Sequence, residues 1–287
     1  MRHHRCRSLI VVATLVAAPV AAQNSTQPLN PGQSSQTAKP APPPSKPAPR
    51  SADGKIVLGT VPGEQGIWVG DGRLVINPRS YEPNSTKNAP IHIDNTPLQD
   101  WARELVNARH GEFLKDEPHA RCKPSGGPRE FITPYGFELL ELPELKQVIV
   151  FDIGGPHSYR VIYMDGRGHP KNLEPSYYGH STGRWEGDTL VIDAVGFNEK
   201  FWMSRDGLPH TEQLHLTERI TRLDYNTLRY EVTIDDPGAY TQPWTSSFNL
   251  RWTPGIELFE YQCQGNNFFP DSVFGANYFD ETMSVVP

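Results

Sequence analysis

The stretch TLRYEVTID, residues 227–235, decides the fold class, because apolar and polar residues alternate along its whole length. Every second side chain is apolar and therefore lies on one face of an extended strand. The residues on that face are Leu228, Tyr230, Val232 and Ile234. One buried face and one wet face are typical of a strand in an antiparallel sheet.

Similar stretches of strand character fill most of the chain after residue 136. They lie at 137–142, 145–153, 158–165, 188–196, 212–222, 246–252 and 256–263. Turns rich in glycine and proline, such as Gly154-Gly155-Pro156, separate them. A long run of antiparallel strands has exposed edges unless the sheet closes on itself. We therefore expect a mainly β fold, an antiparallel meander that closes into a lipocalin-like barrel, with a β-sandwich as the alternative.

One helix is expected before the strands, over residues 97–109. The sequence Thr96-Pro97-Leu98-Gln99 matches a T-x-x-Q capping box with proline in the first turn. Apolar residues then follow helical spacing as far as Val106. We expect this helix to pack on the sheet or to plug one end of the barrel.

Residues 1–22 have the features of a secretory signal peptide. They contain a positively charged start, an apolar run of about ten residues and small residues before a cleavage site after Ala22. We therefore expect an exported protein, periplasmic or extracellular, with an uncleaved anchor as the alternative. Residues 23–50 are rich in proline and lack aromatic side chains, which predicts a disordered linker. Residues 51–287 are then expected to form a single barrel-like domain.

The charge of the chain restricts the class of partner. Without the three arginines of residues 1–22, the chain has 24 Lys and Arg against 33 Asp and Glu, a net charge of −9. Nucleic acids and anionic membranes bind basic surfaces, so neither is an expected partner. No stretch outside residues 1–22 is long and apolar enough to insert into a membrane, and a small-molecule ligand is the expected partner.

The remaining cysteines are Cys122 and Cys263. An even pair in an exported protein predicts one disulfide, and two unpaired thiols are the alternative. Neither residue has a C-x-x-C neighbour, so redox or zinc chemistry at cysteine is not expected.

Residues 179–197, GHSTGRWEGDTLVIDAVGF, resemble the hallmark GHS-x-G-x-WEGDTLV-x-D-x-x-GF of a widespread, uncharacterised family of exported bacterial proteins. Other pieces similar to that family lie between residues 116 and 266, and include CKPSGGPR at 122–129 and DGRGHP at 165–170. The resemblance implies a bacterial origin and a family cysteine pair, and it brings no known activity. Separately, Gly66-Ile67-Trp68 resembles the G-x-W signature of lipocalins.

His180 and Asp193 are the first candidate site residues. His180 lies in an expected loop, where core packing does not require a histidine, and loops on a β scaffold collect binding residues. Asp193 has valines on both sides along one strand face, so its charge needs a partner, such as Arg160, Arg219 or a histidine. Trp185 begins an expected hairpin turn.

Strand 212–222 provides a second candidate pair. If its alternation extends back by two residues, His210 and Glu212 enter the barrel together near its mouth, while His215 faces outward. A histidine and a carboxylate on one face can act as an oriented acid–base pair. Alternatively, His210 and Glu212 could bind a divalent metal together with His180.

No G-x-S-x-G, H-E-x-x-H, Walker or G-x-G-x-x-G motif is present. We therefore expect a cofactor-independent acid–base enzyme of lyase, isomerase or hydratase type that acts on a small apolar or aromatic molecule. The expected catalytic residues are His180, His210, Glu212 and Asp193. The expected substrate-binding residues are Tyr159, Arg167, His169 and Trp185. The alternatives are a lipocalin-like small-molecule binding protein, a divalent-metal enzyme and a structural envelope protein.

Overall fold

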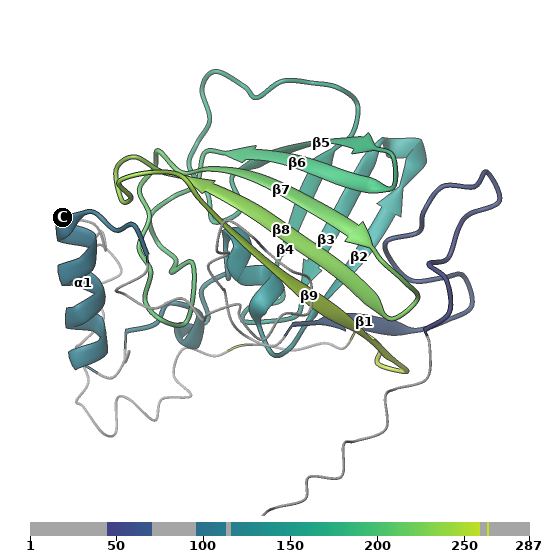
Figure 1. The fold of residues 1–287 in the computed structure, drawn as a ribbon, viewed down its shortest axis with the longest axis horizontal. Coiled ribbons are helices and arrows are strands. Elements are labelled where there is room, and N and C mark those ends of the chain that lie inside the picture. Colours follow the sequence, from purple (N-terminus) through teal and green to yellow (C-terminus); the bar gives the residue numbers. More distant parts are fainter. Residues whose placement is uncertain (1–44, 71–95, 113–115, 259–262, 264–287) are drawn as a thin grey trace, which may run out of the picture. The chain divides into compact units, whose positions relative to one another are not determined.

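The computed structural model describes residues 45–70, 96–112, 116–258 and 263. Over these residues nine strands close into a barrel in which every strand pairs with its neighbours in the chain (Figure 1). The strands are β1 (Gly66–Val69), β2 (Phe137–Leu142), β3 (Gln147–Asp152), β4 (Tyr159–Tyr163), β5 (His180–Glu186), β6 (Thr189–Val195), β7 (His215–Arg222), β8 (Thr227–Asp235) and β9 (Trp244–Pro254). The helical elements are α1 (Asp100–Gly111), η1 (His119–Arg121), η2 (Gly127–Ile132) and η3 (Pro143–Leu145). The expected lipocalin-like barrel is confirmed, and the sandwich is not formed.

One pairing differs from the expected antiparallel meander. Strands β4 and β5 run parallel, with Ile162 opposite Ser181 and Tyr163 opposite Thr182. A parallel pair needs a connection that returns along the sheet, and residues 164–179 provide it as the long loop beside β5 in Figure 1. This loop brings residues 165–170 to the outer wall of the barrel.

The expected strand at 256–263 is not formed by the part of it that the structure describes. Strand β9 ends at Pro254, and residues 256–258 have no strand structure. Residues 259–262 lie outside the described residues. The turn at Gly255, which has a φ of 78°, follows directly after β9.

Side chains fill the interior of the barrel. The segment η2 enters it and places the ring of Phe131 4.8 Å from Phe137 and 4.3 Å from Tyr230. Trp68 packs edge-on against Trp252, with ring centroids 5.2 Å apart. Gly126 allows η2 to enter, because it has a φ of 69° and a Cβ there would collide with a phenylalanine ring. The aromatic residues thus form a packed core.

Helix α1 begins later than the capping box predicts. Gln99 occupies the N-cap without a side-chain cap bond, and its amide instead donates to the carbonyl of Pro237, 3.3 Å away. The preceding Leu98 forms an isolated β-bridge with Tyr240. Tertiary pairing therefore holds residues 96–98 extended, and the prediction of a helix from residue 97 is wrong by three residues at its start.

Residues 45–50 contact the barrel, beginning with Ser45, whose hydroxyl donates to Asp224 at 2.7 Å. Lys46 accepts a backbone hydrogen bond from Tyr225, and Arg50 forms an ion pair with Asp188. The last six residues of the expected linker are therefore attached to the barrel. Residues 1–44, including the expected signal peptide, lie outside the described residues.

The expected disulfide between Cys122 and Cys263 is present, and it links residues 141 positions apart. It connects the segment before η2 to the chain beyond β9. Among the described residues, no helix has the length and apolar character needed to cross a membrane.

Candidate functional site

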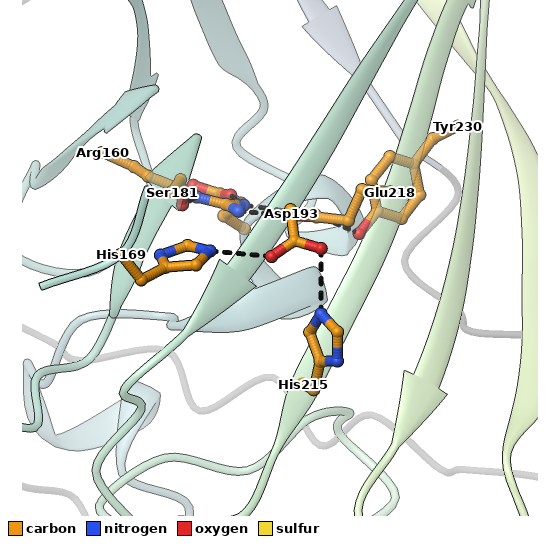
Figure 2. Close-up of polar contacts among 8 residues, drawn as sticks. Arg160, His169, Ser181, Asp193, His215, Glu218 and Tyr230 are labelled. Carbon is orange, nitrogen blue, oxygen red and sulfur yellow. Dashed lines mark hydrogen bonds and ion pairs between the residues drawn. The ribbon is translucent and has the colours of Figure 1, made fainter. Parts of the chain in front are cut away.

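Three histidines and one aspartate meet on the outer wall of the barrel. Strand β6 points Leu190, Ile192 and Ala194 inward, so Asp193 faces outward with 37% of its side chain exposed. His169 Nε2 lies 2.7 Å from Asp193 Oδ1, and His215 Nε2 lies 3.0 Å from Oδ2 (Figure 2). The expectation that a histidine would partner Asp193, and that His215 would lie outside, is confirmed.

His180 continues this chain of contacts. Its Nδ1 lies 2.8 Å from Nδ1 of His169, and its ring stacks on Tyr163 with centroids 5.2 Å apart. The expectation that His180 lies in a loop is wrong, because it is the first residue of β5. Gly179 makes this entry possible, since it has a φ of 58° and a Cβ there would collide with the carbonyl of Val195.

Arg167 supplies a cation beside the histidines. Its guanidinium carbon lies 4.1 Å from the ring centroid of Tyr163, the residue that also stacks on His180. Asp165 fixes it through Nη2 and Nε, at 2.6 and 2.9 Å. About half of the Arg167 side chain is exposed, so the cation remains open to a bound molecule.

The hydrogen-bond chain determines which ring nitrogen can act as a base. An ionised carboxylate only accepts, so His169 Nε2–H donates to Asp193. A neutral His169 then accepts at Nδ1 from the Nδ1–H of His180. The Nε2 of His180 therefore carries the lone pair, and it has no hydrogen-bond partner in the described part of the chain.

The local environment keeps Asp193 charged and His180 neutral. Partial burial opposes ionisation of Asp193, but the hydrogen bonds from His215 and His169 outweigh it and lower the pKa of Asp193. Burial, together with the nearby His169 and Arg167, lowers the pKa of His180. At neutral pH His180 is thus an unprotonated base next to a cation.

The predicted pairing of His210 with Glu212 is wrong. Thr211 binds the carboxylate of Asp236 through its amide and its hydroxyl, both at 2.6 Å, and Leu214 closes a turn onto the Thr211 carbonyl. This turn breaks the alternation before β7, so Glu212 is exposed while His210 is buried.

His210 has a structural partner of its own. Its Nε2–H donates to the carbonyl of Asn198 at 2.8 Å, and its ring packs 4.0 Å from that of Phe201. Burial lowers the pKa of His210 to about 4. The proposed metal set of His210, Glu212 and His180 is not assembled, and within the described ranges no group of three or more His, Cys, Asp or Glu could bind a metal.

Tyr159 and Trp185 take no part in this cluster. Tyr159 is exposed at the start of β4, with Phe151 as its aromatic neighbour at 6.4 Å. Trp185 pairs with Leu190 across the β5–β6 hairpin and is also exposed. The expected hairpin turn at Trp185-Glu186-Gly187-Asp188 is present.

Sequence reasoning missed a buried ionic network inside the barrel (Figure 2). Arg160 forms an ion pair with Glu218 and donates to Glu130 at 2.7 Å and to Ser181 at 2.9 Å. Tyr230 donates to Glu218 at 2.6 Å. Glu218 interrupts the apolar face of strand 212–222, and that interruption was the available signal. Because all five side chains are buried, the network ties β4, β5, β7 and β8 to η2 and does not present a reactive group to solvent.

The fold and the site define a closed β-barrel with a hydrogen-bonded His–Asp cluster on its outer wall. No protein-family model, curated protein or solved structure matches the chain. A function must therefore be inferred from the chemistry of the site.

Proposed function

We propose that the protein is a cofactor-independent acid–base enzyme of lyase or isomerase type, with His180 as its general base. The hydrogen-bonded chain from Asp193 through His169 to His180 carries this proposal. It fixes the tautomer of two rings and leaves one basic nitrogen for a substrate proton. The substrate class that fits is a small aromatic molecule with an acidic proton.

In the proposed reaction, His180 Nε2 takes a proton from the substrate. The positive charge that develops on the imidazole is stabilised through His169 by the Asp193 carboxylate. Arg167 faces the negative charge that remains on the substrate. In an isomerase His180 returns the proton to another atom, and in a lyase a leaving group departs with the electron pair.

The His210 and Glu212 roles expected from the sequence are not part of this proposal, because neither residue reaches the cluster. The lipocalin-like alternative, with a ligand inside the barrel, has less support because aromatic side chains fill the described interior. Export remains a proposal based on residues 1–22, and a disulfide is compatible with an oxidising compartment.

The test uses 5-nitrobenzisoxazole, a flat aromatic molecule whose N–O bond breaks when a base removes its C–H proton. We expect ring opening faster than with free imidazole, and a loss of about 100-fold in His180→Gln, within the usual range for a positioned base. Replacement of Asp193 by Asn should lose about tenfold, because the tautomers are no longer fixed.

The matched control is His110→Gln, since His110 is exposed at the end of α1 and contacts Asp206. It should react like the wild-type protein. A wild-type rate equal to that of His180→Gln would contradict the proposal.

A further inference from the structure

A second site lies at the end of the barrel where β3 ends and β4 begins. It is a cavity of about 340 Å³, lined in the described part of the chain by residues of η1, η2, the loop after β3 and the disulfide. This volume is at the lower end of the range for small-molecule sites. The cavity contains none of the residues of the His–Asp cluster.

Arg129 gives the cavity a buried cation with an unused donor. Only 3% of its side chain is exposed, and it forms an ion pair with Glu117 through Nη2. Its Nη1 is buried without a hydrogen-bond partner among the described residues. An unsatisfied buried donor on a charged group is unfavourable, so an acceptor from a ligand would stabilise it.

The cavity carries a net positive charge. Arg205, which is exposed, lines it together with Arg129, and Glu117 is the anion that opposes them. Burial raises the pKa of Glu117. Two guanidinium groups against one carboxylate favour an anionic ligand.

His119 adds an acceptor to the same wall. Its Nδ1 lies 3.1 Å from the hydroxyl of Ser125, and Ser125 in turn favours the charged form of the Asp152 carboxylate. Because a carboxylate accepts, the hydroxyl donates to Asp152 and accepts from the Nδ1–H of His119. The Nε2 of His119 therefore carries a lone pair, and it is buried without a partner in the described residues.

His119 is uncharged, so its Nε2 can act as a hydrogen-bond acceptor. Burial, and then the positive charges of Arg129 and Arg205, lower the pKa of His119 to about 4. The ring is neutral at pH 7 and accepts a hydrogen bond from a ligand. Pro134, Tyr135 and Ile153 complete the lining with apolar surface.

We infer that this cavity binds a small aromatic carboxylate that also carries a hydroxyl group. The carboxylate binds Arg129 Nη1 and Arg205, and the hydroxyl donates to Nε2 of His119. The ring lies against Pro134, Tyr135 and Ile153. This site is independent of the proposed base at His180.

Isothermal titration calorimetry with the full chain tests this inference, with 4-hydroxybenzoate as the probe. We expect saturable binding at pH 7.5. The uncharged 4-hydroxybenzamide should bind at least about tenfold more weakly, because it loses the charge-assisted bonds. Benzoate should bind several-fold more weakly, because it lacks the donor for His119.

Variants separate the contacts. Arg205→Gln should weaken 4-hydroxybenzoate about tenfold, as expected for the loss of one charged contact. Arg251→Gln, a matched change at an exposed residue of β9, should have no effect. His119→Phe should bring 4-hydroxybenzoate to the affinity of benzoate. We use the Arg205 variant as the decisive test. An Arg129 variant would also remove the ion pair that stabilises the buried Glu117.

Three results would overturn the inference: no saturable heat at millimolar 4-hydroxybenzoate, equal affinity for the amide, or unchanged affinity in Arg205→Gln. Binding should persist in His180→Gln. The binding test of this cavity can therefore fail or succeed independently of the activity test of His180.

Discussion

At the residue scale, the same side chain takes opposite roles according to its burial. His180 is half-buried beside Asp193 and His169, where a neutral imidazole serves as a base. His210 is fully enclosed, packs on Phe201 and donates one hydrogen bond to a backbone carbonyl. Both have a lowered pKa, so a perturbed pKa alone does not separate a reactive group from a structural one.

His210 should make the fold sensitive to mild acid. Its pKa is about 4 in the fold against an ordinary value of about 6.5, so the unfolded chain binds a proton first as the pH falls. The stabilisation is complete above pH 6.5 and is lost as the pH falls to 4, on the order of 3 kcal/mol.

Urea unfolding at pH 7 and pH 4.5 measures this effect. His210→Gln keeps a donor for the Asn198 carbonyl and cannot titrate, so its stability should fall less between the two pH values than that of the wild-type protein. His110→Gln serves as the exposed control. Equal losses in the wild-type protein and His210→Gln would show that His210 is not responsible.

Asp193 has a pH dependence of the same sign as that of His210, at lower pH. Its pKa is lowered in the fold, so its contribution to stability is present above the unfolded value of about 4 and is lost as the pH falls below it. NMR titration of the Asp193 carboxyl group is the sharper measurement, because His215→Phe removes one of the two histidine donors that lower its pKa. The pKa of Asp193 should rise in the variant, and an unchanged pKa would contradict the hydrogen-bonded cluster.

At the element scale, the alternation of apolar and polar residues determined which strands the sequence could predict. Strand 227–235 was predicted with the bounds of β8, because a period of two is a local signal. The turn at 211–214 was missed because it depends on Asp236, which lies 25 residues from Thr211 in the chain. The contact of His169 with His180 was missed for the same reason, since it depends on the parallel pairing of β4 with β5.

The buried network around Arg160 predicts a non-additive pair of substitutions. Burial raises the pKa of Glu130 to about 8, so at pH 7 it is mainly neutral and Glu218 balances Arg160. Either acid alone can pair with the guanidinium, because both contact it. Glu130→Gln should therefore cost less than about 1.5 kcal/mol, and Glu218→Gln should cost more because it loses the bidentate pair.

The double variant leaves a buried cation without a partner, which typically costs about 3–5 kcal/mol. Its free energy of unfolding in urea should therefore fall by more than the sum of the single changes. Additive costs would mean that the two carboxylates do not substitute for each other.

At the scale of the whole molecule, the barrel separates two chemically different sites. The His–Asp cluster lies on strands β5 to β7 and the crossover loop, and the cavity lies among η1, η2 and the disulfide. The strand residues of the cluster, His180, Asp193 and His215, are held in position by the pairing of β5, β6 and β7. The cavity is formed by irregular segments, so its shape depends on what holds those segments together.

The Cys122–Cys263 disulfide is the covalent part of that support, and it spans 141 residues. On the chain-entropy account, closing a loop of that length restricts the unfolded chain enough to stabilise the fold by about 5 kcal/mol. The double variant Cys122→Ser/Cys263→Ser should therefore unfold at a much lower urea concentration. Because Cys263 lines the cavity, the variant should also bind 4-hydroxybenzoate more weakly, while ring opening by His180 is retained below the unfolding transition. Equal losses at both sites before unfolding would show that the disulfide supports the whole barrel and not only the cavity end.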